Sequence, residues 1–129
     1  MSKYGNYKTK TSDGIVHDSQ AEAMRWSQLC MMSRAGAIKD LRRQVEYELI
    51  PTQYAPSTEA YKVGARKGQP KPGRVIEKRV VYRADFVYTD AATGHTVVED
   101  TKGFRTKDYI IKRKLMLYVH HIKITEVSV

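Results

Sequence analysis

Two acidic residues and one lysine have the side-chain types and the spacing that phosphate chemistry needs. Asp100 and Lys102 are two residues apart in the segment 97–103, and Asp85 lies in the preceding segment 82–88. Successive side chains of a strand point to opposite faces, so Asp100 and Lys102 share a face if their segment is a strand. A hairpin between the two segments brings Asp85 beside Asp100. The pattern therefore predicts two carboxylates and an ammonium group that meet at one point.

Such a group of side chains suits a divalent cation. Two carboxylates held close together repel each other unless a proton or a cation lies between them. Their hard oxygen atoms favour Mg²⁺ or Mn²⁺. A bound ion polarises a phosphoryl oxygen and activates a water molecule, and a nearby lysine stabilises the charge that develops on the phosphate. Because short Asp-x-Lys triplets are common, a solvated face of an ordinary sheet is the alternative interpretation.

Apolar periodicity and turn signals predict the elements that hold these residues. Ser19 and Glu22 have the spacing of a capping box, so we expect a helix from there to about Arg34. Thr106 is placed to cap a second helix. Residues 37–41 are ambiguous between a helix end and a turn. The predicted order is helix, three strands, helix and strand, over about 19–34, 45–50, 75–88, 95–101, 107–120 and 122–127.

The length and the cysteine content set the general class. The 129 residues suit a single domain over 1–129, and 41% of them are hydrophobic, as in globular proteins. The one cysteine, Cys30, cannot form an internal disulfide, which fits the reducing cytoplasm. No apolar stretch follows the first charged residues, so we expect no secretory signal. No apolar run reaches the ~20 residues that span a bilayer.

The charge of the chain indicates a polyanion as partner. Lys and Arg number 23 against 14 Asp and Glu, a formal net charge of +9. An anionic membrane surface requires a basic amphipathic helix with a broad apolar face, which the sequence lacks, so we expect no membrane partner. Nucleic acid is the favoured partner. A merely soluble basic protein is the alternative.

The basic residues are concentrated in two segments. Residues 61–83 hold eight basic residues and one acid, and residues 102–114 hold six and one. All four prolines lie in 51–73, so we interpret 51–73 as a basic mobile loop. Such basic side chains bind the DNA backbone without reading its sequence. The residues expected to contact DNA are Arg66, Lys67, Lys71, Arg74, Arg83, Arg105, Lys107 and Lys112.

Taken in order, these segments resemble the PD-(D/E)xK nuclease superfamily, and more narrowly a family of small, mostly phage- and prophage-encoded uncharacterised nucleases. The blocks that carry the resemblance are 13–22, 35–44, the two acidic motifs and 112–115. The resemblance implies an α/β (α+β) domain with a restriction-endonuclease-like αβββαβ core, a central mixed sheet flanked by helices. It also implies Mg²⁺-dependent (or Mn²⁺-dependent) hydrolysis of DNA phosphodiester bonds. By motif match, Asp85 and Asp100 are metal ligands and Lys102 is the catalytic lysine.

The resemblance adds a third acid to the site. Related nucleases place an acid on the first helix near the metal, and Glu22 matches that position on the same helical face as Trp26 and Leu29. We therefore expect Glu22 to be catalytic and a metal ligand; the alternative is that it only completes the capping box. Gln44, at the start of an alternating strand, either supports a ligand or water or is an ordinary strand-edge residue.

The substrate expected by analogy is branched DNA, such as a Holliday junction, in phage recombination, repair or replication within the bacterial host cytoplasm. A homodimer is expected in that case, because two strands must be cut symmetrically. Two alternatives remain open from the sequence. One is a non-catalytic DNA-binding module that keeps a nuclease fold. The other is a sequence-specific endonuclease of the restriction type.

Overall fold

Four strands form the central sheet that carries the acidic residues. In the computed structural model, which describes residues 7–128, β3 (Ile38–Ile50), β6 (Val80–Asp90), β7 (Thr96–Thr101) and β8 (Thr125–Val127) lie in the order β3-β6-β7-β8. The β3–β6 and β6–β7 pairs are antiparallel, whereas β8 is parallel to β7. The sheet is therefore mixed, as predicted. Residues 1–6 and 129 of the predicted domain lie outside the described residues.

Two helices complete this α+β domain within the described residues, and each begins at the predicted cap. Helix α1 (Gln20–Arg34) follows Ser19, whose Oγ accepts a hydrogen bond from the N–H of Glu22 at 3.1 Å. Helix α2 (Lys107–His120) follows Thr106, whose Oγ1 accepts from the N–H of Tyr109 at 3.1 Å. Such caps satisfy N–H groups that have no partner inside the helix. The predicted order of helix, three strands, helix and strand is confirmed for these main elements.

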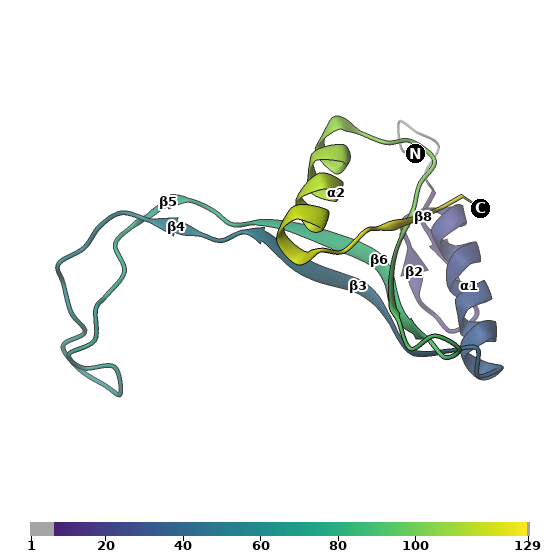
Figure 1. Cartoon of the computed structure of the whole chain (residues 1–129), viewed down its shortest axis with the longest axis horizontal. Coiled ribbons are helices and arrows are strands. Elements are labelled where there is room, and N and C mark those ends of the chain that lie inside the picture. Colours follow the sequence, from purple (N-terminus) through teal and green to yellow (C-terminus); the bar gives the residue numbers. More distant parts are fainter. Residues whose placement is uncertain (1–6, 129) are drawn as a thin grey trace.

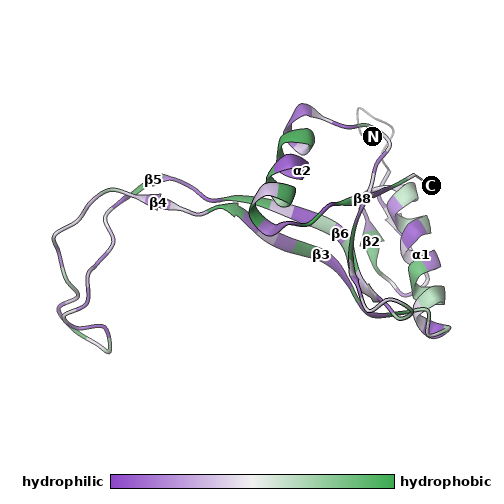
Figure 2. Ribbon diagram, viewed as in Figure 1, coloured by the Kyte–Doolittle hydropathy of each residue, from purple (hydrophilic) through white to green (hydrophobic). Residues whose placement is uncertain are grey.

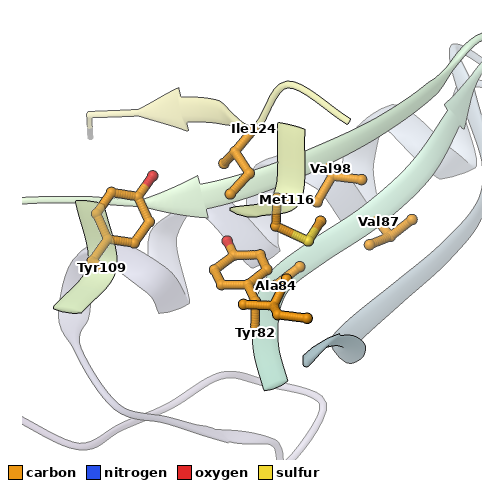
Figure 3. Packing of buried hydrophobic residues seen from close by; sticks show 8 residues of the cluster. Tyr82, Ala84, Val87, Val98, Tyr109, Met116 and Ile124 are labelled. Atoms are coloured by element: carbon orange, nitrogen blue, oxygen red, sulfur yellow. The ribbon is translucent and has the colours of Figure 1, made fainter. Parts of the chain in front are cut away.

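The helices cover opposite faces of the sheet. Neighbouring residues of β7 show this, because Val97 packs into a cluster with Leu29 of α1 while Val98 packs into a cluster with Met116 of α2. Figure 3 shows the second cluster, in which Met116 lies among the apolar side chains of the sheet. Complete burial of a Val, Leu, Ile, Phe or Met side chain stabilises a fold by about 1.5–3 kcal/mol. The two apolar clusters therefore hold the sheet between the helices.

The side-chain alternation of the sheet reverses at one position on each of two adjacent strands. On β6, Ala84 belongs to the α2 cluster and Phe86 to the α1 cluster, so the faces switch at Asp85. On β3 the register pairs Arg43 with Phe86 and Val45 with Ala84, which puts Gln44 opposite Asp85. Gln44 has φ 54°, in the left-handed region that L-residues rarely adopt. This irregularity brings Gln44 and Asp85 together at one point of the sheet.

Two predicted strand boundaries differ from the structure. The expected strand over 75–88 is split into β5 (Val75–Glu77) and β6, because β5 pairs with β4 (Gln53–Tyr54) outside the central sheet. Of the ambiguous residues 37–41, residues 38–41 belong to β3, which pairs with β6 from Ile38 onward and has an irregularity at Asp40 with φ 56°. A short pair, β1 (Thr9–Lys10) and β2 (Val16–His17), precedes α1.

Residues 51–79 form an arm that extends away from the rest of the described chain, which we call the body (Figure 1). Backbone hydrogen bonds cross between its two limbs, from Ala55 N–H to the carbonyl of Arg74 at 2.8 Å and from Lys71 N–H to that of Glu59 at 2.9 Å. Figure 2 shows that most of the arm is hydrophilic or neutral, whereas the central strands alternate between green and purple bands. The predicted loop is thus a paired arm, and its mobility stays a prediction.

Candidate active site

A pocket of about 590 Å³ lies where the start of α1, the middle of β6 and the segment after β7 meet. Glu22, Asp85 and Lys102 are among the residues that line it. These are three of the four residues that the sequence predicts to be catalytic. The remaining residue, Asp100, is not among the lining residues; it is 3% exposed and contacts Lys102, which does line the pocket. The structure therefore brings the predicted catalytic residues into one region.

Glu22 points inward from the first turn of α1 and is 5% exposed. Its Oε1 accepts a hydrogen bond of 2.8 Å from Nε2 of Gln44, and Nδ1 of the buried His17 lies 4.0 Å from the same oxygen. Burial raises the pKa of the Glu22 carboxyl, and the charge of Asp18 raises it further. Gln44 thus holds an acidic side chain directly by a hydrogen bond, and its role in supporting a metal ligand or water stays a prediction.

Asp85 lies at the reversal of alternation on β6. Its Oδ2 accepts a hydrogen bond of 2.8 Å from the backbone N–H of Thr101 on β7. Burial raises the pKa of the Asp85 carboxyl to about 7, with a further contribution from the charge of Asp100. The register pairs Phe86 with Glu99, so one residue further along Asp85 lies opposite Asp100, as the hairpin predicted.

Asp100 is held from both sides. Its Oδ2 accepts a hydrogen bond of 2.5 Å from the hydroxyl of Tyr82, and its Oδ1 lies 2.9 Å from Nζ of Lys102. That ion pair lacks the alignment of a hydrogen bond, so Oδ1 is a buried oxygen without a hydrogen-bond partner. Nζ of Lys102 also lies 4.1 Å from the ring centroid of Tyr109. Asp100 and Lys102 share one face of the sheet, as their spacing predicts.

Two residues of this site were missed by reasoning from the sequence. Tyr82 binds Asp100, and burial together with the charge of that carboxylate raises the pKa of the Tyr82 phenol. His17, which is 1% exposed, lies beside Glu22. A tyrosine in the middle of a buried strand needs a partner for its hydroxyl, and this requirement is the signal that was available for Tyr82. No comparable signal marked His17.

The carboxylates fit a divalent cation by their chemistry. Glu22, Asp85 and Asp100 come from α1, β6 and β7 and supply the hard oxygen ligands that Mg²⁺ and Mn²⁺ prefer. The raised pKa of Asp85, which burial and the charge of Asp100 cause, indicates a place where additional positive charge is favourable. Among residues 7–128, however, no three acidic, histidine or cysteine side chains are already arranged as a ligand set.

Glu99 points to the opposite face from Asp100, as the alternation predicts. Its carboxylate is fully buried and accepts hydrogen bonds from Nε and Nη2 of Arg25 at 2.9 and 2.7 Å. The hydroxyl of Tyr88 donates a third hydrogen bond to it. Arg25 is three residues after Glu22 on α1, so this ion pair ties the helix that carries Glu22 to the strand that carries Asp100. The sequence did not reveal this connection.

The predicted DNA-binding residues fall into two groups. Those on the arm are all exposed: Arg66, Lys67, Lys71 and Arg74. Those on the body are more constrained, because Arg83 donates to Glu46 at 2.9 Å and Arg105 donates to Glu126 at 3.1 Å. Lys107 opens α2, and Lys112 is half-buried on the same helix. Of these eight predicted residues, the two that form ion pairs with acids, Arg83 and Arg105, are both on the body.

A second pocket, of about 600 Å³, lies farther along α1 and includes Asp13, Cys30 and Arg34 in its lining. Its carboxylate, Asp13, accepts hydrogen bonds from the Thr11 hydroxyl and from Nε1 of Trp26, and these hold the pKa of Asp13 down to about 2. The carboxylate thus serves as a structural acceptor. Cys30 is half-buried there, and burial raises the pKa of its thiol, which opposes nucleophilic use.

Comparisons with known proteins bear on the family and not on the activity. No helix within residues 7–128 is long and apolar enough to cross a bilayer. No curated protein and no solved structure shows significant similarity to the chain. One family model matches residues 1–128, which is almost the whole length. The chain therefore belongs to the family DUF1064, described as proteins of unknown function.

Proposed function

We propose that this chain is a DNA endonuclease that depends on Mg²⁺ or Mn²⁺ and hydrolyses phosphodiester bonds. The observation that carries the proposal is the convergence of Glu22, Asp85 and Asp100 with Lys102 beside one pocket of a strongly basic protein. The mixed sheet with a helix on each face is consistent with a restriction-endonuclease-like core, which we include in the proposal. The charges of Glu22, Asp100 and Lys102 all act on the Asp85 carboxyl, although these residues come from different parts of the chain.

The roles of the side chains follow from their positions. Glu22 and Asp85 line the pocket and would hold the cation there together with Asp100, whose orientation the hydroxyl of Tyr82 maintains. When bound, the cation would polarise the phosphate and lower the pKa of a bound water molecule. Lys102 is 23% exposed at the pocket wall, so its ammonium group can turn from Asp100 toward a phosphate oxygen. There it stabilises the negative charge that develops during hydrolysis.

DNA is the proposed substrate because its phosphates match the net charge of +9. By analogy with other small nucleases, we propose that branched DNA such as a Holliday junction is cut by a homodimer, one active site for each strand. The cytoplasm of a bacterial host is the proposed location, since the substrate and the cation are both found there.

A cleavage assay tests the proposal. Supercoiled plasmid, linear duplex, nicked duplex and a four-way junction are incubated with the full chain in Mg²⁺ or in EDTA. We expect cleavage in Mg²⁺ only, and a loss of at least ~100-fold in Asp100→Asn and in Lys102→Met. Glu48→Gln and Lys123→Met, which change exposed residues outside the pocket, are matched controls and should cleave as the wild type does.

The pattern of products separates the alternatives. Cleavage that persists both in EDTA and in Asp100→Asn overturns the proposed mechanism. Tight binding of DNA without cleavage of any form identifies the chain as a non-catalytic binding module. Discrete fragments from linear duplex identify an endonuclease of the restriction type.

A further inference from the structure

The end of the arm presents an apolar side chain among basic ones. Val63 is 82% exposed, and its neighbours Lys62, Arg66 and Lys67 are all exposed. An isolated exposed valine is common on a protein surface. This one, however, lies at the turn of a projecting hairpin, where an exposed apolar residue adds nothing to the core. Its position therefore suggests contact with another molecule.

The tip has a defined backbone. Gly64 and Gly68 adopt φ 84° and 87°, in the left-handed region that glycine enters without strain. The N–H of Lys67 donates to the carbonyl of Gly64 at 3.2 Å, and the N–H of Gly68 donates to that of Tyr61 at 2.9 Å. These bonds close the turn, so Val63 is presented in a fixed place.

Tyr61 supports the tip from below. Its ring is half-buried, and the guanidinium carbon of Arg66 lies 5.7 Å from the ring centroid. Nη1 of Arg66 also donates to the Tyr61 hydroxyl at 3.4 Å. These two contacts hold the Arg66 guanidinium against the Tyr61 ring, within the same turn as Val63.

The charge of the arm matches a polyanion. Residues 51–79 hold seven basic residues and two acids, a net +5 of the chain's +9. All seven basic side chains are exposed: Lys62, Arg66, Lys67, Lys71, Arg74, Lys78 and Arg79. A paired strand rises about 3.3 Å per residue, so limbs of about 14 residues reach at most about 45 Å. That length is comparable with one turn of duplex DNA, about 34 Å.

We propose that the arm is a second DNA contact, in which Val63 enters the base stack as a wedge while Lys62, Arg66 and Lys67 bind the flanking phosphates. Apolar side chains flanked by basic ones are known to enter and kink base steps in this way. The inference rests on the proposed function only in taking DNA as the polyanion. Because unstacking opposes the wedge, the arm prefers DNA that is already unstacked at a bulge, mismatch or junction.

Two double variants test the electrostatic part of the inference. Arg66→Gln/Lys67→Gln removes two charges from the tip, and Lys39→Gln/Arg42→Gln removes two exposed charges from the opposite end of β3. Binding of the full chain to a fluorescent 30-base-pair duplex is measured in EDTA at several salt concentrations. We expect the tip variant to bind at least ~10-fold more weakly than the wild type. The slope of log binding constant against log salt concentration should become shallower by about 2 in the tip variant and should not change in the control.

Single variants of Val63 test the wedge. The same duplex is compared with one that contains a two-nucleotide bulge flanked by 2-aminopurine. We expect the wild type to prefer the bulged duplex and to raise the 2-aminopurine fluorescence. Val63→Ser should lose ~5–10-fold in binding to the bulged duplex and less than twofold in binding to the perfect one. Val63→Ile keeps the apolar side chain and should behave like the wild type.

The outcomes separate this inference from the nuclease proposal. A Val63→Ser variant that keeps both the preference and the fluorescence change overturns the wedge, even where the wild type cleaves DNA in Mg²⁺. A tip double variant that binds DNA as tightly as the wild type overturns the arm contact, as does binding to anionic phosphatidylserine vesicles in place of DNA. Arm-dependent binding without any cleavage supports this inference and removes the nuclease.

Discussion

The carboxyl group of Asp85 lies where burial and neighbouring charges both oppose its ionisation. Its pKa is raised to about 7, so near neutral pH the folded chain holds a proton that an exposed aspartate has already lost. Under the proposed function, a divalent cation would replace that proton without leaving the carboxylates to repel each other. Cation binding at this site is therefore expected to release a proton and to strengthen as the pH rises toward 7.

Asp85→Asn should make the stability of the chain less dependent on pH. The pKa of Asp85 is about 7 in the folded state against an ordinary value of 3.8, so the folded chain binds more protons than the unfolded chain between these values. Wild-type stability from this group is present below pH 3.8 and falls as the pH rises to about 7, by up to about 1.4 kcal/mol per unit. The side-chain amide of the Asp85→Asn variant does not titrate, so this variant does not lose stability in that way as the pH rises. Urea denaturation at pH 4.5, 6 and 8 without divalent ions measures the free energy of unfolding of both proteins, and Asp108→Asn is the control. If the free energy of unfolding changes with pH by the same amount in the wild type and in Asp85→Asn, the prediction is contradicted.

Divalent cations should stabilise the wild type at pH 8 and not Asp85→Asn. Binding to the folded state alone adds about 2.7 kcal/mol when the cation is present at 100 times its Kd. Thermal denaturation in Mg²⁺, Mn²⁺ and EDTA measures the shift in Tm. An equal shift in both proteins indicates that the cation binds elsewhere. Asp108→Asn, which changes an exposed acid of α2, should shift as the wild type does.

Gln44 combines a left-handed backbone with a hydrogen bond to Glu22. Gln44→Ala loses the bond and keeps the unfavourable φ, so it should destabilise the fold by about 1–3 kcal/mol. Gln44→Gly loses the same bond but relieves the strain, so it should be about 1 kcal/mol more stable than the alanine variant. Chemical denaturation measures both. Equal stability of the two variants indicates that the left-handed conformation carries no penalty.

At the scale of elements, the ion pair between Arg25 and Glu99 joins α1 to β7. Removing one partner leaves a buried charge without compensation, so Arg25→Met should cost about 3–5 kcal/mol. Arg25→Met/Glu99→Met removes both charges and should recover a large part of that loss. The exposed Arg34→Met on the same helix is the control and should change stability by less than about 0.5 kcal/mol. Additive effects in the double-mutant cycle contradict a coupled pair.

At the scale of the whole molecule, the arm and the body are expected to be energetically separate. No residue of either apolar cluster lies between 55 and 74. Replacing 55–74 by Asn-Gly closes the arm where Ala55 N–H meets the carbonyl of Arg74, and it keeps the pairing of Gln53 with Glu77. We expect a Tm within ~4 °C of the wild type, together with much weaker DNA binding. A large loss of Tm shows instead that the arm supports the fold.

Features that depend on neighbouring residues could be predicted from the sequence. Ser19 and Thr106 cap their helices because a hydroxyl there reaches an N–H three residues later. Asp100 and Lys102 share a face because the side-chain period of a strand is two. The hairpin between them and Asp85 follows from one turn signal. These relationships need no knowledge of the rest of the chain.

Other features were decided only by the tertiary structure, because they join residues that are distant in the sequence. Arg25 and Glu99 are 74 residues apart, and no local pattern identifies a partner at that distance. The reversal at Gln44 and Asp85 is hidden because apolar alternation does not record which backbone position adopts a positive φ. By itself the sequence determined the types of the acidic residues and their strands. The packing of α1 and the irregular β3–β6 pair decided that Gln44 lies opposite Asp85 and donates a hydrogen bond to Glu22, since only folding brings such separated residues together.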